Sequence, residues 1–186
     1  MLNKFSDWPS PKITNYLLWI GFIIYISLFP LTIYFINISG YAISDMLMGR
    51  LSFSGDVLKD HYKTIDIDAY RIGQILDFGI LLGYGMALFS LSLIIARRYD
   101  AFSNWRKSGY VVSVICVFSA CCDALENTFV LLTLTDSTGF PEIWAVLNSF
   151  FVLLTFTMLL CIGWIFSAAI NLTIKKSQKR NKLKQN

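Results

Sequence analysis

The sequence predicts an all-α protein: a four-helix transmembrane bundle with both termini in the cytoplasm. Three observations lead to this prediction. The 186 residues are 55% hydrophobic with a mean hydropathy of +0.57, which is more apolar than soluble domains usually are. Four apolar runs, at 16–38, 72–96, 110–134 and 143–172, are each long enough to cross the hydrocarbon core of a bilayer. Lys and Arg are unevenly shared among the segments that join these runs.

The first run, 16–38, follows a polar segment that contains Pro9 and Pro11. The run is too long for the apolar core of a signal peptide, and no small-residue cleavage site follows it, so we expect a retained span. Pro30 lies inside the run, where its ring displaces a backbone hydrogen bond and is expected to bend the helix.

The segment 39–71 is the longest polar connection in the chain. Connections of this length are uncommon in compact domains and are often functional, so we predict an external loop that caps the bundle or lies at the interface. Within it, SGDVLKDHY at 54–62 begins with a plausible N-cap serine and predicts a short amphipathic helix.

The second run, 72–96, has a polar face and a neighbouring face of small residues. Arg71, Gln74, Asp77 and Tyr84 fall roughly on one side of the predicted helix. The small residues repeat every four positions, a spacing that lets helices approach closely in lipid. They are Gly79, Gly83 and Ala87.

The third run, 110–134, carries Asp123, Glu126 and Asn127 at i, i+3 and i+4, so a helix places all three on one face. A carboxyl at bilayer depth costs roughly 2.5–3.5 kcal/mol on insertion scales and is a candidate for function by default. The fourth run, 143–172, follows an acidic turn, has Asn148 near its start and leads into a basic tail at 173–186 that we expect to be frayed.

Charge distribution predicts the orientation. Twelve of the 16 Lys and Arg residues lie before the first run, between the second and third runs, or in the tail, and the other four lie in 39–71. Because cytoplasmic segments carry an excess of Lys and Arg, we predict cytoplasmic termini, an external 39–71 and a basic cytoplasmic tail in a multi-pass protein of the cytoplasmic (inner) membrane. A nucleic-acid partner is not expected, because no basic residues are interleaved with aromatics on a soluble surface.

The carboxyls are predicted to meet near the external face. A rise of 1.5 Å per residue places Asp123 about 21 Å and Asn127 about 27 Å above the inner end of their helix, and Asp77 about 30 Å above the end of its own. Asn148 falls at a similar depth. One interpretation is a buried hydrogen-bond network that holds the helices in register, with Arg71 compensating one carboxylate.

The other interpretation is a working site. Closely spaced carboxyls in a dry cavity acquire separated pKa values, as acid–base chemistry requires, and Asp123, Glu126, Asp77 and Tyr84 are the catalytic candidates. No cofactor is predicted. His61, from the loop, is a weak candidate that together with these acids could ligate a divalent metal.

Two segments resemble a set of uncharacterised prokaryotic four-helix integral membrane proteins. They are ILDFGILLGYGMAL at 75–88, preceded by FSGDVLKDHY, and CCDALENTFVLL at 121–132. Those proteins carry an L-D-F…Y segment in the second helix and D-x-x-E-N in the third. The resemblance covers about 53–132, implies that Asp77, Tyr84, Asp123, Glu126 and Asn127 form one feature, and implies no activity.

The sequence therefore leaves three functional hypotheses. The first is an outward-facing intramembrane acidic pocket, at Asp77, Tyr84, Asp123, Glu126, Asn127 and Asn148, that is structural or binds a lipid, a cation or a protein partner at the external face. The alternative is a membrane-embedded enzyme that acts on a lipid by carboxylate or metal-assisted chemistry. The third is a small oligomeric ion transporter, which needs oligomerisation because only four spans and no repeat are present.

Overall fold

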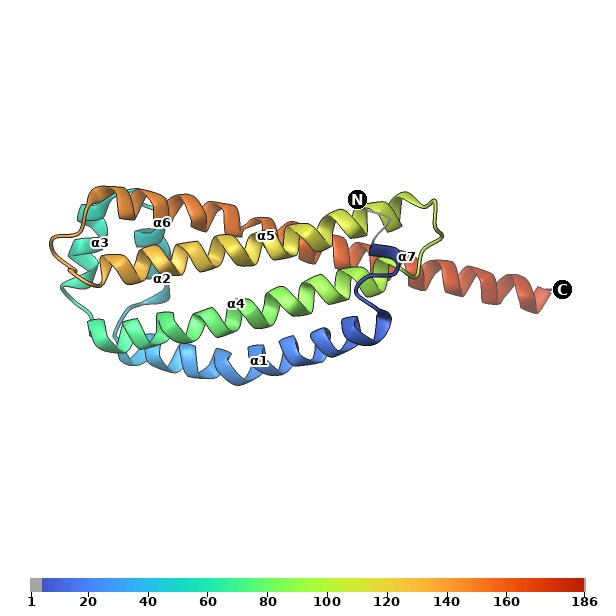
Figure 1. Ribbon diagram of the computed structural model, residues 1–186, viewed down its shortest axis with the longest axis horizontal. Coiled ribbons are helices and arrows are strands. Elements are labelled where there is room, and N and C mark those ends of the chain that lie inside the picture. Colours follow the sequence, from blue (N-terminus) through green and yellow to red (C-terminus); the bar gives the residue numbers. More distant parts are fainter. Residues whose placement is uncertain (1–4, 186) are drawn as a thin grey trace.

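The computed structural model describes residues 5–185, and the chain is all-helical, with no strand, over that range. Figure 1 labels the helices along the chain. They are α1 (Pro11–Ile38), α2 (Ile43–Arg50), α3 (Gly55–Tyr62), α4 (Ile67–Ala96), α5 (Asn104–Thr133), α6 (Glu142–Thr155) and α7 (Thr157–Gln185).

Four helical stretches are long and apolar enough to cross a membrane: α1, α4, α5 and the α6–α7 stretch over Glu142–Gln178. The first three begin five or six residues before the apolar runs do, because polar residues cap them. The Ser10 hydroxyl accepts from the Ile13 amide, the Asp66 carboxylate caps α4, and the Ser103 hydroxyl caps α5. Hydropathy predicts the apolar part of a helix, whereas capping decides where the helix begins.

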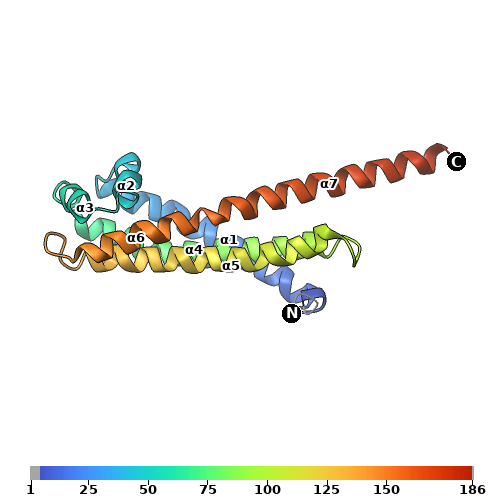
Figure 2. The ribbon, with the colours of Figure 1, turned by 90° about the horizontal axis from the view of Figure 1, so that it is seen from above.

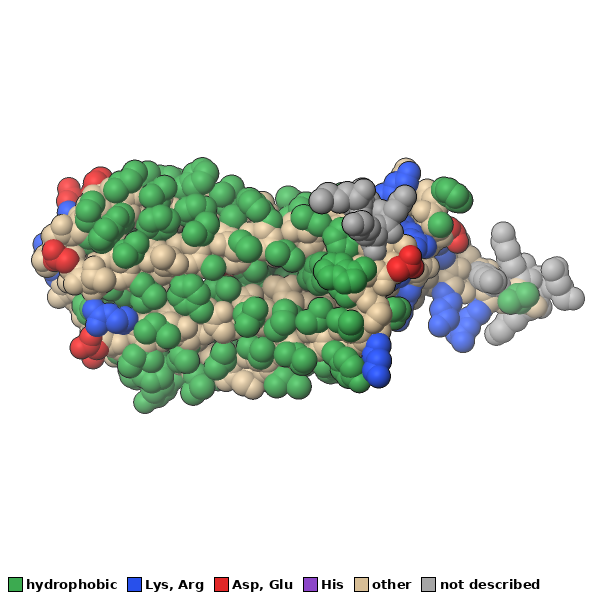
Figure 3. Space-filling model, viewed as in Figure 1, with side chains coloured by type: hydrophobic (Ala, Val, Ile, Leu, Met, Phe, Trp, Pro, Cys, Tyr) green, Lys and Arg blue, Asp and Glu red, His purple; other side chains and the backbone are tan. Residues whose placement is uncertain are grey.

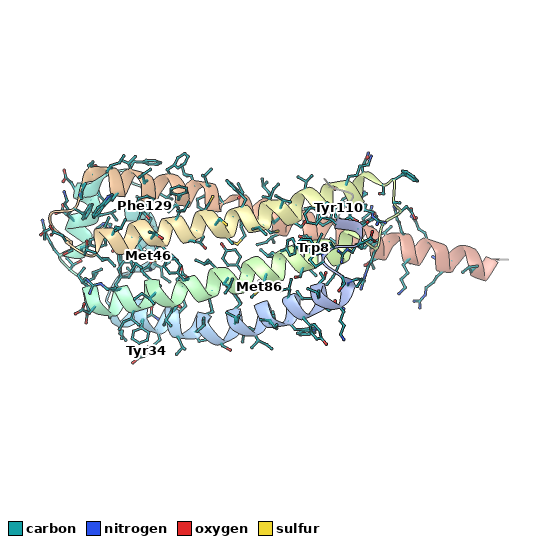
Figure 4. All side chains as sticks on the ribbon, in the orientation of Figure 1. Trp8, Tyr34, Met46, Met86, Tyr110 and Phe129 are labelled. Carbon is teal, nitrogen blue, oxygen red and sulfur yellow. The ribbon has the colours of Figure 1, made fainter. Side chains whose placement is uncertain are left out.

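The long helices lie side by side in the order α1, α4, α5 and α6–α7, and both chain ends lie at the same end of the molecule (Figure 1). The short helices α2 and α3 sit together at the opposite end (Figure 2). Hydrophobic side chains cover the long flanks, and charged side chains gather toward the two ends (Figure 3). Tyr34, for example, points outward from α1 and is 58% exposed (Figure 4).

Glycines bring α1 and α4 into backbone contact. A Cβ atom on Gly21 would lie 2.5 Å from the Gly83 carbonyl oxygen, and one on Gly83 would lie 2.8 Å from the Tyr25 amide nitrogen. A Cβ atom on Gly79, one turn away, would overlap the Leu28 side chain. The small-residue stripe predicted on the second run is thus a helix-packing surface, and α1 supplies the matching glycine. α1 continues as one helix across Pro30.

The fourth predicted span is interrupted at Phe156, between α6 and α7. The Ser119 hydroxyl of α5 donates a 3.0 Å hydrogen bond to the Thr155 carbonyl, and the Leu159 amide bonds to Phe156 instead of continuing the α-helical pattern. A side chain inserted into the backbone ladder is a recognised cause of helix kinks. The interruption therefore depends on a contact with another helix, which the sequence of 143–172 does not reveal.

The segment 39–66 forms a cap over one end of the long helices, whereas residues 67–71 of the predicted 39–71 loop belong to α4. α3 corresponds to the predicted short helix, whereas α2 was not predicted. Tyr41, Leu58 and Tyr62 pack from the cap against Tyr70 of α4 and Val130 of α5. Burial, followed by the neighbouring Tyr70, raises the pKa of both Tyr41 and Tyr62 above the usual value.

The opposite end is held by Arg97, just beyond α4. Its guanidinium donates to the backbone oxygens of Phe5 and Pro9 and to the Thr14 hydroxyl at 2.6–3.0 Å, which ties the segment before α1 to α4.

The tail was predicted to be frayed, but α7 continues to Gln185 and projects beyond the other helices (Figures 1 and 2). Lys, Arg, Gln and Leu dominate this stretch, and all are strong helix formers.

Candidate functional site

Arg50, the last residue of α2, reaches from the cap into the interior of the protein. Its guanidinium donates to Glu126 Oε1 at 2.5 Å, to the Tyr70 hydroxyl at 3.1 Å and to Gln74 Oε1 at 2.8 Å. The side chains of Arg50 and Glu126 are only 13% and 4% exposed. A cation from a polar connection thus forms a buried ion pair with a carboxylate of α5.

This pair corrects the prediction that Arg71 compensates one of the carboxylates. Arg71 instead pairs with Asp68, one turn away, at 2.7 Å and donates to the Leu134 carbonyl at 2.8 Å. Its side chain is 40% exposed. Arg71 lies at the solvent-facing end of α4, so its nearest acceptors are local, whereas α2 carries Arg50 inward to the level of Glu126.

The other predicted carboxyls are bridged by polar side chains on neighbouring helices. The Asn127 amide of α5 donates to Asp77 Oδ2 of α4 at 2.8 Å. The Tyr84 hydroxyl of α4 donates to Asp123 Oδ2 of α5 at the same distance. Asp77, Asp123 and Glu126 also lie within electrostatic range of one another and of Arg50. The structure therefore brings Asp77, Tyr84, Asp123, Glu126 and Asn127 together, as the sequence predicted.

Carboxyls outnumber cations in this cluster. Among the described residues, Arg50 is the one base near the three acids Asp77, Asp123 and Glu126, and its ion pair is with Glu126. A buried negative charge without a partner is strongly disfavoured, so Asp77 and Asp123 require a hydrogen-bond donor or a cation nearby. Asp77 and Asp123 are half-buried, and each already accepts from one neutral donor.

Asn148 of α6 is also buried at this level. Ser119 and Thr155 bring α5 and α6 together, and Asn148 lies two turns before Thr155 on α6. The side chain of Asn148 is 1% exposed, and neither polar atom of its amide has a hydrogen-bond partner within residues 5–185. Asn127 Oδ1 and Arg50 Nε are likewise buried without a hydrogen-bond partner among the described residues.

His61 does not join the acids. Its Nδ1 atom lies 3.0 Å from the Tyr41 hydroxyl in the cap, and the two rings meet edge to face. Within the described part of the chain no three His, Cys, Asp or Glu side chains are grouped so that they could hold a metal ion. The weak metal candidate drawn from the sequence therefore has no ligand set around it.

A cleft of about 510 Å³ runs along α4 and gives access to part of the cluster. α1 and α7 form its sides, and α2 closes one end through Met46 and Arg50. The cleft is partly open to the surface, and most of its lining is apolar. Its apolar lining consists of Phe22, Tyr25, Phe29, Ile33, Ile36, Met46, Ile80, Ala87, Leu88, Met158 and Ile162.

The polar lining is concentrated on α4 and α2. Gln74, Asp77 and Tyr84 lie along α4, and Arg50 lies at the closed end. On the facing wall, Thr32 of α1 is 3% exposed, and its hydroxyl has no hydrogen-bond partner within residues 5–185. The cleft thus combines long apolar walls with one polar region that contains Asp77 and an unpartnered hydroxyl.

Comparison of the chain with protein-family models, with curated proteins and with solved structures gave no match. The resemblance to uncharacterised four-helix membrane proteins remains a prediction. The geometry of the cluster and the cleft therefore carries the proposal that follows.

Proposed function

We propose that the chain is a multi-pass protein of the cytoplasmic membrane, with α1, α4, α5 and α6–α7 in the bilayer. The apolar flanks and the charged ends support this placement (Figure 3). Arg97 and Arg98 follow α4 directly, and Arg106 and Lys107 lie in the first turn of α5, at the end that also holds both chain termini. Because basic residues favour the cytoplasmic side, the cap lies outside and both termini lie inside.

Cysteine labelling tests this orientation. In a Cys121→Ser background, which removes the exposed native thiol, a cysteine at Asp56 of the cap is expected to react with a membrane-impermeant maleimide in intact cells. A matched cysteine at the exposed Lys107 is expected to react only after the membrane is permeabilised. The reverse pattern would show that the proposed orientation is wrong.

Within this placement, the cleft along α4 binds an amphiphile that enters from the bilayer. The observation that carries this proposal is one cavity with apolar walls on α1, α4 and α7 and a polar region at Asp77 and Tyr84. A volume of about 510 Å³ lies within the usual range for small-molecule sites, about 300–1,000 Å³. An alkyl chain buries apolar surface along the walls, while a head group reaches Asp77 and the Thr32 hydroxyl.

The charge of the cluster indicates which head group fits. The positive charge of Arg50 is already balanced by Glu126, and its two terminal nitrogens donate to Glu126, Tyr70 and Gln74, which leaves only the buried Nε without a partner. Asp77 lines the cleft, and Arg50 is the one cation among the described residues of that lining. A head group that donates hydrogen bonds or carries positive charge, such as an amine, therefore fits better than a carboxylate or a phosphate.

Binding of single-chain amphiphiles tests this assignment. Dodecylamine is expected to raise the unfolding temperature of the protein in nonionic detergent, and dodecanoate, which has the same chain length, is expected to leave it unchanged. Asp77→Asn removes the carboxylate charge at the cleft and should abolish most of the dodecylamine shift. Asp68→Asn, on an exposed acid of the same helix, is the control and should retain it. An equal shift with dodecanoate, or an undiminished shift in Asp77→Asn, would contradict the head-group assignment.

One observation supports acid–base catalysis on such a ligand as a second candidate function. Tyr84 lines the cleft and donates to Asp123, so the tyrosine hydroxyl connects the cleft to a carboxyl behind it. Proton transfer needs this combination of a group within reach of the ligand and a nearby acid or base. Turnover can be measured by incubating the protein with a membrane lipid extract and detecting products by mass spectrometry. If the site is catalytic, Asp123→Asn should still bind dodecylamine but should no longer convert any lipid of the extract.

A further inference from the structure

A second hollow lies far from the acidic cluster, at the end of the molecule that holds both termini. We propose that this α4–α7 groove binds the phosphate group of an anionic phospholipid from the cytoplasmic leaflet. The inference rests on the membrane placement proposed above and is independent of what the cleft binds. The groove has a volume of about 260 Å³ and is lined by Ile95, Arg98, Ala169, Leu172, Thr173 and Lys176.

Two cations face this groove without a carboxylate partner. Within residues 5–185, neither Arg98 nor Lys176 takes part in an ion pair. Nearby basic residues are engaged elsewhere. Arg97 donates to backbone oxygens near the start of the chain, Arg106 bonds the Tyr110 hydroxyl, and Lys175 lies over the Tyr99 ring. Arg98 and Lys176 therefore leave charged donors available for an anion.

Aromatic side chains place the groove at the depth of lipid head groups. Tyr99 stacks on Trp105, and Trp105 contacts Trp164, beside the groove residues Ile95 and Leu172. Trp and Tyr concentrate at the boundary between hydrocarbon and water. The Tyr99 hydroxyl donates to the Ala168 carbonyl at 2.7 Å, which fixes α7 against the end of α4 and keeps the groove in shape.

The apolar part of the lining distinguishes a lipid from a soluble phosphate. Ile95, Ala169 and Leu172 lie on the helices before Arg98 and Lys176, on the side of the hydrocarbon core. An acyl chain can cover these residues while the phosphate reaches the two cations. Basic pockets between transmembrane helices on the cytoplasmic side are a known arrangement for anionic lipid head groups.

Native mass spectrometry of the detergent-solubilised full chain tests the proposal. Titration with dioleoyl phosphatidylglycerol is expected to give one tightly bound lipid, and dioleoyl phosphatidylcholine is expected to bind much more weakly. Replacing both cations, in the variant Arg98→Gln/Lys176→Gln, should weaken phosphatidylglycerol binding by about tenfold or more, since it removes both charged donors that line the groove.

The matched control is Lys107→Gln/Arg180→Gln. It removes the same charge from exposed positions outside the groove and should bind phosphatidylglycerol like the wild type. Equal losses in both double variants would show attraction to total charge and would overturn the site. Competition by glycerol 3-phosphate at equal concentration would overturn the assignment to a lipid. If cysteine labelling gives the reverse pattern while the groove variant still loses phosphatidylglycerol, the orientation and the cytoplasmic leaflet are wrong, but the groove still binds an anionic phospholipid.

Discussion

Replacing Arg50 with methionine is expected to destabilise the protein by about 3–5 kcal/mol, because it leaves Glu126 buried without its cation. Glu126 is 4% exposed on its side chain, and Tyr70 and Gln74 lose the same partner. The change also removes the bonds that tie the end of α2 to α4 and α5, while the apolar contacts of the rest of the cap remain. Unfolding in detergent can be followed by the reactivity of the buried thiols of Cys116 and Cys161.

Three further variants separate charge from packing. Arg71→Gln, which removes an exposed ion pair with Asp68, is expected to cost no more than about 1 kcal/mol. Arg50→Lys keeps the positive charge but lacks the planar guanidinium that bonds three acceptors. We therefore expect its stability to lie between those of Arg50→Met and the wild type. Arg50→Met/Glu126→Leu removes both charges and should be more stable than Arg50→Met alone. If the double variant were as unstable as Arg50→Met alone, Arg50 would stabilise the protein through its bonds to Tyr70 and Gln74 and not by neutralising Glu126.

Gly83→Leu is expected to separate α1 from α4 and to cost about 3 kcal/mol or more, toward the upper range for overpacking. The two atoms nearest to a Cβ on Gly83 would be backbone atoms, the Tyr25 nitrogen at 2.8 Å and the Gly21 oxygen at 2.9 Å, and these cannot rotate away. Because α1 is one wall of the cleft, the same variant should lose the shift of its unfolding temperature with dodecylamine.

Gly163→Ala is the matched control for this helix contact. Gly163 lies within α7, and a Cβ atom there would meet nothing within 4 Å. Replacing a glycine inside a helix with alanine favours the helix by up to about 1 kcal/mol, so this variant should unfold at or above the wild-type temperature. Wild-type stability in Gly83→Leu would mean that α1 and α4 do not approach at this point.

The carboxyl cluster could be predicted from the sequence because its signals are local. Asp123, Glu126 and Asn127 are conspicuous in an apolar run, and helical spacing alone places them on one face. The residues of α4 were found in the same way. That the acids of α4 and α5 lie near one another followed from similar depths in neighbouring helices, but the individual contacts of Asp77 with Asn127 and of Tyr84 with Asp123 were not predicted.

Arg50 had no comparable signal. It lies in a polar connection that also holds Lys59, Lys63 and Arg71, where one more cation is unremarkable. Its partner Glu126 is 76 residues away, so the pairing depends on how α2 folds over the ends of α4 and α5. Arg71 was the better guess by sequence position alone, because it adjoins the second run, but its side chain remains at the surface.

The sequence by itself determined the four apolar helices, their helix-packing glycines on α4 and the acids that they carry. Each of these depends on residues a few positions apart, through hydropathy and helical periodicity. Only the tertiary structure decided which cation neutralises Glu126, where α6 gives way to α7 and how α1, α4 and α7 enclose a cleft. These features arise from contacts between segments distant in the chain, and only packing determines which of the available partners meet.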